Sequence, residues 1–448
     1  MFLVFRVKFQ KIFRGIKMYF IKRNDWLKKI FLMTILVIFL FACSQGGDSP
    51  STSGDSTTPQ NPEGYLVKAT SLAEISTSSL ILAAQNAGFP AAVGQFMKYP
   101  IKVFKITYRT TYKGKPILAS GLISCPTGVS DALPTLIVAN IQSYTDIDAP
   151  SEFSLPNHFT PLAAFASAGY FTIIPDMIGY GVSKNTIFPM QNYEHSAIAM
   201  IDFIKACDEF FKANKMKVNN KKFLAGYSEG GYTALASLKM IEEKPVSDIK
   251  IEATAVGAGG YNLVGLLDKI VLHGDGTYSA PSHIVSLLYS YNVMYDWNRP
   301  LTDFFQEPYA GRIPGLLDGT HNREEIDSQL TTDLNRLLNP DFLSALKGHG
   351  EEELMNALIE NSIDDWTPKG NLMLFHNRYD EKVPFGDTLE TYQKMISRGA
   401  QNVVLRDTSQ FESHVDSGVA FVVIVSLWFE SMNQELDPNH FPSGGGFF

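Results

Sequence analysis

The chain contains a serine in a setting that is typical of a catalytic nucleophile. The apolar residues 223–225 lead into Gly226-Tyr227-Ser228-Glu229-Gly230, a Gly-x-Ser-x-Gly pentapeptide, and small, helix-forming residues follow. A strand, a tight turn and a helix in this order hold a serine hydroxyl exposed at the tip of a strained turn. Side chains two positions before and after the serine would collide there, and Gly226 and Gly230 remove them. The sequence therefore predicts Ser228 as a nucleophile.

Two further residues could complete the chemistry of such a serine. Residues 371–384 read as a buried strand that breaks into a polar loop with Asp380, and the short strand Val403–Leu405 precedes a loop with His414. A serine hydroxyl is a poor nucleophile without a base within hydrogen-bond reach. His414 would take the proton from Ser228, and Asp380 would hold the imidazole and stabilise its charged form. The chain order Ser228, Asp380, His414 differs from that of trypsin-like and subtilisin-like enzymes.

Other residues compete for these roles. His376 ends the same predicted strand, and we interpret it as a structural histidine braced by the loop. Asp407 is close to His414 in sequence and is an alternative acid. Asp176 is expected to cap a turn, and His195 is expected to lie on the surface or in packing.

An acyl-transfer reaction also needs donors for its oxyanion. The first expected donor is the backbone N–H of Glu229, the residue after the nucleophile. The second should come from the loop after the strand Leu136–Ala139, where Gln142 and Ser143 are the two candidates. This loop lacks the His-Gly pair that many esterases carry.

The elements around these residues alternate between strand and helix. A hairpin is predicted from Val103–Tyr112 and Lys115–Ile123, with its turn at Lys113-Gly114. Further strands are predicted over 134–139, Phe171–Pro175 and Ile251–Gly257, and helices over Pro161–Ala168 and Glu194–Lys212. This alternation predicts an α/β fold with a mostly parallel, doubly wound sheet.

The alternation stops at residues 260–368, which we interpret as a helical cap insertion within a hydrolase domain that spans residues 63–448. Helical patterns there include Glu324–Leu338 and Phe342–Asn361. Another helix is predicted from an apolar stripe at i, i+3, i+4 and i+7, which fits ordinary packing as well as a pocket lining. Its members are Ile284, Leu287, Leu288 and Tyr291. A final helix is expected over Val419–Phe429.

The first 62 residues resemble an export and anchoring device. Two lysines precede the apolar run Ile30–Ala42, which is too short to span a bilayer and suits a signal peptide. It ends at Cys43 in a sequence similar to the lipobox of bacterial lipoproteins. We therefore expect a lipoprotein signal peptide at residues 1–42, a lipidated Cys43 and a disordered tether at residues 43–62. The expected location is the bacterial cell envelope, anchored to a membrane, with the outer membrane favoured.

Charge and cysteine content exclude several classes of protein. The full chain has a net charge of −8, and removal of residues 1–42, with nine Lys/Arg and one Asp, brings it near −16. This balance argues against nucleic acid as a partner. A single disulfide between Cys125 and Cys207 would suit an exported protein, but two buried free thiols are favoured, and no His/Cys spacing resembles a zinc site.

The motifs together resemble a known family. Gly226–Gly231, the Pro175-Asp176-x-x-Gly179-Tyr180-Gly181 turn and the loops of Asp380 and His414 look like those of the α/β-hydrolases. Within that superfamily, the chain over Val103–Phe429 is similar to secretory lipases of the lipase A type. The resemblance implies hydrolysis of small-molecule or lipid carboxylic esters through an acyl-enzyme, without a cofactor. A prolyl-oligopeptidase-type peptidase is one alternative, although no repeat indicates the propeller of those enzymes. A non-catalytic binding protein on a hydrolase scaffold is another, although it would not need an intact triad.

Overall fold

The computed structural model describes seven stretches of the chain, which are residues 63–86, 94, 96–153, 161–244, 249–348, 350–411 and 413–434. The expected signal peptide, Cys43 and the expected tether therefore lie outside the described residues.

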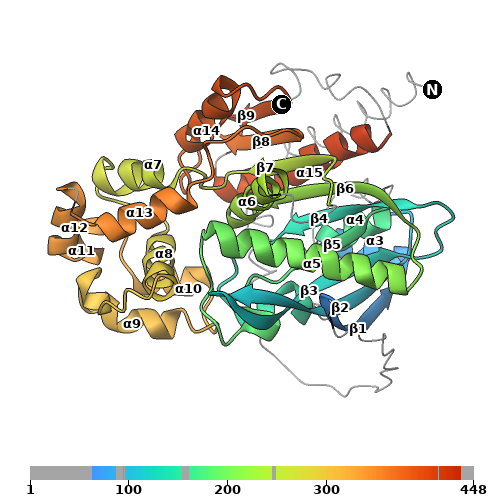
Figure 1. Ribbon diagram of the computed structural model, residues 1–448, viewed down its shortest axis with the longest axis horizontal. Coiled ribbons are helices and arrows are strands. Elements are labelled where there is room, and N and C mark those ends of the chain that lie inside the picture. The colour runs from blue at the N-terminus through green and yellow to red at the C-terminus, as the bar shows by residue number, and fades with distance from the viewer. Residues whose placement is uncertain are drawn as a thin grey trace.

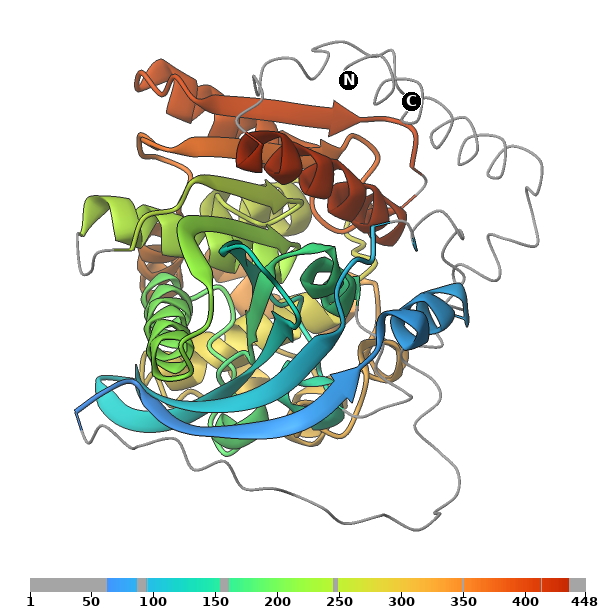
Figure 2. The same cartoon turned by 90° about the vertical axis from the view of Figure 1, so that its right-hand side faces the viewer.

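A nine-stranded sheet forms the centre of the molecule, in the order β1-β2-β3-β5-β4-β6-β7-β8-β9 (Figure 2). Neighbouring strands from β5 through β4 to β9 are parallel, whereas β1, β2, β3 and β5 pair in antiparallel fashion. The strands are β1 (Leu66–Ile75), β2 (Ile101–Tyr112), β3 (Lys115–Pro126), β4 (Leu133–Ala139), β5 (Phe171–Pro175), β6 (Val218–Tyr227), β7 (Ala253–Gly257), β8 (Asn371–Asn377) and β9 (Val403–Thr408). The predicted doubly wound, mostly parallel α/β sheet is confirmed.

The first strand of the sheet has no counterpart among the predicted elements. β1 pairs with β2 in a register that shifts twice, between Leu66 and Lys68 and between Ser71 and Ala73. Each shift interrupts the alternation of buried and exposed side chains by which a strand is recognised in a sequence. The predicted hairpin is present as β2 and β3, and both of its turn residues, Lys113 and Gly114, have positive φ.

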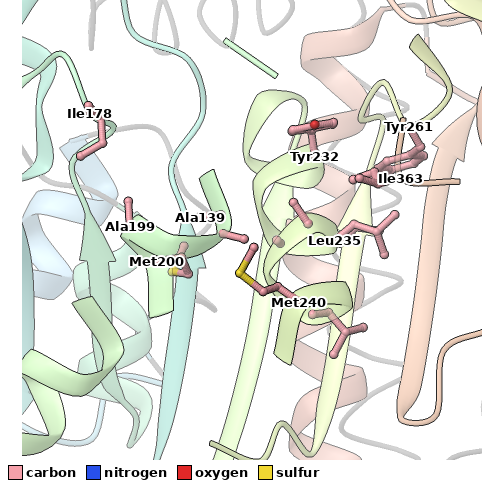
Figure 3. Close-up of a cluster of buried hydrophobic side chains, with 14 of the residues drawn as sticks. Ala139, Ile178, Ala199, Met200, Tyr232, Leu235, Met240, Tyr261 and Ile363 are labelled. Atoms are coloured by element: carbon pink, nitrogen blue, oxygen red, sulfur yellow. The ribbon is translucent and has the colours of Figure 1, made fainter. Parts of the chain in front are cut away.

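Helices cover both faces of the sheet. Alternate residues of a strand point to opposite faces, so Leu136 and Phe223 pack with α15 while Ile137 and Leu224 pack with α5 and α6. The flanking helices are α3 (Thr77–Asn86), α4 (Pro161–Ala168), α5 (Tyr193–Ala213), α6 (Glu229–Glu243), α14 (Phe385–Ser397) and α15 (His414–Asn433). Figure 3 shows part of the core that α5 and α6 form with the sheet. Cys125 and Cys207 are buried and unbridged, as expected.

Residues 260–368 form a separate group of helices at one end of the sheet, on the left of Figure 1. They are α7 (Leu263–Leu267), α8 (Pro281–Met294), α9 (Tyr309–Leu316), α10 (Arg323–Gln329), α11 (Leu334–Leu337), α12 (Pro340–Lys347) and α13 (Glu352–Asn361). Two predicted helices were too long. The pattern 324–338 is divided where Asp333 caps α11 through its side chain, and the pattern 342–361 is divided after Gly348.

The two ends of this helical segment meet. Ile363 N–H donates to the carbonyl of Tyr261 at 2.8 Å, and Figure 3 shows both side chains together. The buried carboxyl of Asp387 on α14 accepts the N–H groups of Tyr261 and Asn262, each at 2.9 Å. Entry and exit are therefore fixed to each other and to the core.

Helix α15 is the one described helix whose length and composition would allow it to cross a membrane, with a mean hydropathy of 1.5. It packs instead against β6, β7 and β8. Phe421, Val425 and Phe429 are buried against the sheet. This packing accounts for the 44% of its most apolar window that is buried.

Candidate active site

Ser228 lies in a strained turn between β6 and α6. Its φ is 57° and its ψ is −125°, a conformation that a non-glycine residue adopts only when its surroundings enforce it. A Cβ on Gly226 would lie 2.0 Å from the carbonyl oxygen of Gly230, and a Cβ on Gly230 would lie 2.4 Å from that of Ala139. The turn thus requires glycine at both positions, as predicted, and Gly230 allows β4 and its following loop to approach the start of α6.

The structure brings Ser228, His414 and Asp380 together. His414 Nε2 lies 3.0 Å from Ser228 Oγ, and His414 Nδ1 lies 2.7 Å from Asp380 Oδ2. The three residues follow β6, β9 and β8, whose carboxyl ends meet at one edge of the parallel sheet. The side chains of His414 and Asp380 are buried. This geometry allows proton transfer between the hydroxyl and the imidazole, with the carboxylate holding the imidazole.

The carboxylate of Asp380 is held by its own loop. Its Oδ1 accepts the N–H groups of Lys382 and Val383, each at 2.9 Å. Burial works to raise the pKa of Asp380, but hydrogen bonds from His376 and His414 outweigh it and hold the pKa below its usual range. Asp380 is therefore ionised and able to stabilise an imidazolium.

His376 has a larger part in the site than its sequence indicates. Its Nε2 lies 3.0 Å from the carbonyl of Val383, and its Nδ1 lies 2.6 Å from Thr388 Oγ1, which agrees with a structural histidine braced by the loop. The same Nε2 is also 3.3 Å from Asp380 Oδ2. His376 therefore helps to hold the same carboxylate oxygen that His414 contacts.

The position of His414 depends on two residues that the motif analysis missed. Tyr227 Oη lies 2.7 Å from the carbonyl of His414 and 2.6 Å from Ser417 Oγ. Glu381 Oε2 accepts the backbone N–H of His414 at 2.8 Å. Both residues adjoin a predicted triad member in sequence, but their contacts are formed only when β6, β8 and α15 meet.

The competing residues lie in other surroundings. Asp407 pairs with Arg378. Asp176 is buried and accepts the Ser151 N–H at 2.8 Å and a hydrogen bond from the hydroxyl of Ser120, so its hydrogen bonds go to residues outside the turn that it was expected to cap. His195 is part-buried and receives the N–H of Lys113 at 2.9 Å.

The expected oxyanion donors are only partly brought together. Glu229 is the first residue of α6, where backbone N–H groups have no acceptor within the helix. Gln142 Nε2 points at Met190 Sδ, 3.9 Å away, and Ser143 Oγ donates to the Thr145 carbonyl at 3.1 Å. The observed side-chain contacts of Gln142 and Ser143 are thus with residues other than Ser228, and the choice between them stays a prediction.

The side chain of Glu229 is buried beside the nucleophile. Its Oε1 accepts the N–H of Gln191 at 3.2 Å, and Gln191 has a φ of 45°. Burial raises the pKa of Glu229 to about 7, and the hydrogen bond from Gln191 opposes this only in part. The fold therefore favours the neutral carboxyl.

This shift makes the stability of the protein depend on pH. The contribution of Glu229 is fully present below its ordinary pKa of 4.5 and is lost as the pH rises through about 7. We expect Glu229→Gln to reduce the loss of unfolding free energy between pH 4.5 and pH 8 by roughly 3 kcal/mol. Urea unfolding at both pH values measures this, and Glu243→Gln on the same helix controls for the loss of one carboxylate. An unaltered pH dependence in Glu229→Gln would contradict the assignment.

A largely apolar pocket lies next to the loop of Asp380, although the three triad residues are not among those that line it. Its cavity volume is about 110 Å³, and it lies between the helical segment 260–368 and the loop residues 190–191 and 382–383. Gln191 and Lys382, which bond to Glu229 and Asp380, are among its lining residues. Ile284, Leu287 and Leu288 of the predicted stripe line it as well. The fourth stripe residue, Tyr291, is buried and donates its hydroxyl to the Gln191 carbonyl.

Comparisons with known proteins address the fold. No protein-family model matches the sequence, and a search of curated proteins finds no relative. One similar crystal structure is that of a Legionella pneumophila protein named only provisionally as a hydrolase. Its TM-score is 0.74 at 23% identity, and the match covers 85% of this chain and 100% of the Legionella chain. The rice cell wall degrading esterase LipA from Xanthomonas oryzae has a TM-score of 0.70 and 22% identity, with 80% and 95% covered.

Candida antarctica lipase A is also similar, with a TM-score of 0.60 and 15% identity, and with 84% of each chain covered. The chain has the α/β-hydrolase fold. The expected resemblance is thereby confirmed at the level of the fold. In an α/β-hydrolase fold, the turn after the nucleophile strand exposes the serine above the sheet, and Ser228 occupies that turn here. Within the described residues, no group of three or more His, Cys, Asp or Glu side chains forms a metal site.

Proposed function

We propose that this protein is a serine hydrolase that cleaves carboxylic esters. The observation that carries the proposal is the continuous contact from Ser228 Oγ through His414 to Asp380. Structural relatives that include an esterase and a lipase support an ester as the substrate. Peptide hydrolysis uses the same three groups, but no observation favours it here.

The mechanism follows from the geometry. His414 Nε2 takes the proton of Ser228 as Oγ attacks the ester carbonyl, and Asp380 stabilises the imidazolium at Nδ1. The backbone N–H of Glu229, at the start of α6, stabilises the oxyanion in this mechanism. The imidazolium then protonates the leaving alcohol. Water, activated by the same imidazole, releases the acid from the acyl-enzyme.

We further propose that residues 260–368 act as a cap whose pocket holds the hydrocarbon part of the ester. The lining is dominated by aliphatic side chains from α7, α8, α12 and α13. Burial of each methylene there stabilises a bound chain by about 0.8 kcal/mol. Esters with longer chains should therefore be bound more tightly until the pocket is full.

Hydrolysis of p-nitrophenyl esters of increasing acyl length by the purified protein tests the function, and absence of turnover on every ester would contradict it. Leu287→Trp fills the pocket from α8 and is expected to lower the ratio of long-chain to short-chain kcat/KM by about tenfold or more. Ile359→Trp is a matched control, because Ile359 lies on α13 with 60% of its surface exposed. If Leu287→Trp left the preference for acyl length unaltered, the acyl chain of the ester would have to bind outside this pocket.

We also propose that the protein is attached to the bacterial envelope through a lipid on Cys43. The lipobox-like residues 40–43 and the polar segment after them support this. A chain that begins at Ser44 behind an ordinary cleavable signal is expected to be released from the membrane fraction, because stable anchoring depends on attached acyl chains. Fractionation with immunodetection measures this. Unaltered membrane association of that variant would contradict the anchor.

A further inference from the structure

One residue in the loop of Asp380 brings a cationic side chain to the lining of the apolar pocket. Among the described residues that line it, Lys382 is the only charged side chain. Lys382 is 9% exposed, and its backbone N–H is bonded to Asp380. A charged group beside an apolar lining is stabilised by a compensating partner or by solvent, and Nζ of Lys382 is not among the buried atoms, so it keeps some contact with solvent.

The ammonium group of Lys382 has no such partner in the part of the chain that the structure describes. No hydrogen bond to Nζ is formed there, and no carboxylate lies within 4.0 Å. Two of the acidic groups whose charges act on Lys382 are hydrogen-bonded to other residues. Glu381 accepts the N–H of His414, and Asp327 accepts the N–H of Ser282.

Two other neighbouring groups are also accounted for. The Arg323 guanidinium pairs with Glu324 at 3.1 Å. His283 lines the pocket, and burial together with the charges of Arg323 and Lys382 lowers its pKa to about 3, so that its imidazole is neutral. No nearby group therefore neutralises Lys382 by direct contact.

The backbone of Lys382 is fixed, so the position of its side chain is restricted. Tyr278 Oη donates to the carbonyl of Lys382 at 3.1 Å and lies 3.2 Å from His283 Nδ1. Burial lowers the pKa of Lys382 to about 8, with Arg323 adding to the effect. At neutral pH the side chain is still mostly protonated and can donate three hydrogen bonds.

We propose that Lys382 binds an acidic oxyanion, a carboxylate or a phosphate, on an ester whose hydrocarbon chain fills the pocket. This inference rests on the proposed ester hydrolysis and specifies its substrates as amphiphilic esters with an acidic group near the scissile bond. A bound oxyanion would supply the protein-side partner that the ammonium lacks among the described residues, through charge-assisted hydrogen bonds. Perturbed, unpaired ionisable groups in clefts are characteristic of such functional sites.

Matched ester pairs test the proposal and distinguish where the oxyanion is attached. On the alcohol side, 1-decanoylglycerol 3-phosphate is compared with 1-decanoylglycerol. On the acyl side, the p-nitrophenyl monoester of glutaric acid is compared with p-nitrophenyl valerate. We expect the anionic member of at least one pair to be preferred. Lys382→Met should lower the anionic-to-neutral ratio of kcat/KM in that pair by about tenfold to a hundredfold.

Two variants serve as controls. Lys382→Arg keeps the charge and should retain most of the preference. Lys269→Met removes a lysine that precedes two pocket residues in sequence and pairs with Glu390 at 2.8 Å, and should leave the ratio unaltered. Equal ratios for the parent and Lys382→Met in both pairs would overturn the proposal and leave Lys382 as packing through its aliphatic stem.

A binding measurement separates this inference from the proposed reaction. Calorimetry compares decyl phosphate with decanol, neither of which can be hydrolysed by an esterase. Tighter binding of decyl phosphate that is lost in Lys382→Met would support the anion site even if no ester were turned over. Equal binding of the two probes by a protein that hydrolyses esters would overturn the anion site and leave the proposed reaction intact.

Discussion

Replacement of Ser228 by alanine is expected to lower ester turnover by about 10⁵- to 10⁶-fold. The reason is that Ser228 Oγ is the atom that attacks the carbonyl carbon of the ester. His414 Nε2 lies 3.0 Å from this oxygen and removes the hydroxyl proton. The single variant His414→Ala should lose about as much. The double variant should be little worse than either single variant, because the two groups act in one step.

Initial rates with a p-nitrophenyl ester measure these losses, and circular dichroism shows whether each variant is folded. Losses that multiply in the double variant would mean that Ser228 and His414 act independently, which contradicts the proposed triad.

The second large effect is expected at the acid. Asp380→Asn should lower kcat by about 10⁴-fold. Its amide can keep the hydrogen bonds from Lys382 and Val383 only by turning an NH₂ group towards His414 Nδ1. The imidazole is then held in the tautomer that carries its proton on Nε2, which cannot accept the proton of Ser228.

Asp407→Asn is the matched control for this change. Asp407 pairs with Arg378 on the surface side of β9, so its amide variant should leave turnover close to that of the parent protein. The same assay and substrate apply to both variants. If Asp407→Asn caused the larger loss, the acid would have to be reassigned.

Much of the site could be predicted because its constraints are local. Only glycine avoids the collisions at positions 226 and 230, and a run of apolar residues marks each parallel strand, since both faces of the sheet are covered. The order of the three triad residues then limited the topology. The same reasoning favoured Asp380 over Asp407, and the structure places Asp380 2.7 Å from His414 Nδ1.

The parts that could not be predicted depend on contacts between distant segments. The hydroxyl of Tyr227 meets the carbonyl of His414 across 187 residues, and no local pattern indicates that pair. The lack of a partner for the Lys382 ammonium likewise depends on how α10 and the loop of Asp380 meet at the pocket. In the helical segment 260–368, helix periodicity continued across Asp333 and Gly348, where side-chain capping and a glycine divide the helices.

The hydrogen-bonded ends of the 260–368 segment bear on whether this segment can be replaced or altered in length. Ile363 and Tyr261 are hydrogen-bonded, and β7 and β8 remain adjacent in the sheet although this long segment separates them in sequence. The entropy cost of closing a loop rises by only about 0.6 kcal/mol when its length doubles. The segment is therefore a cassette that can be lengthened, shortened or grafted from another protein at Tyr261 and Ile363. The reacting groups would stay on the core, while the graft would bring its own pocket wall and with it a new range of substrates.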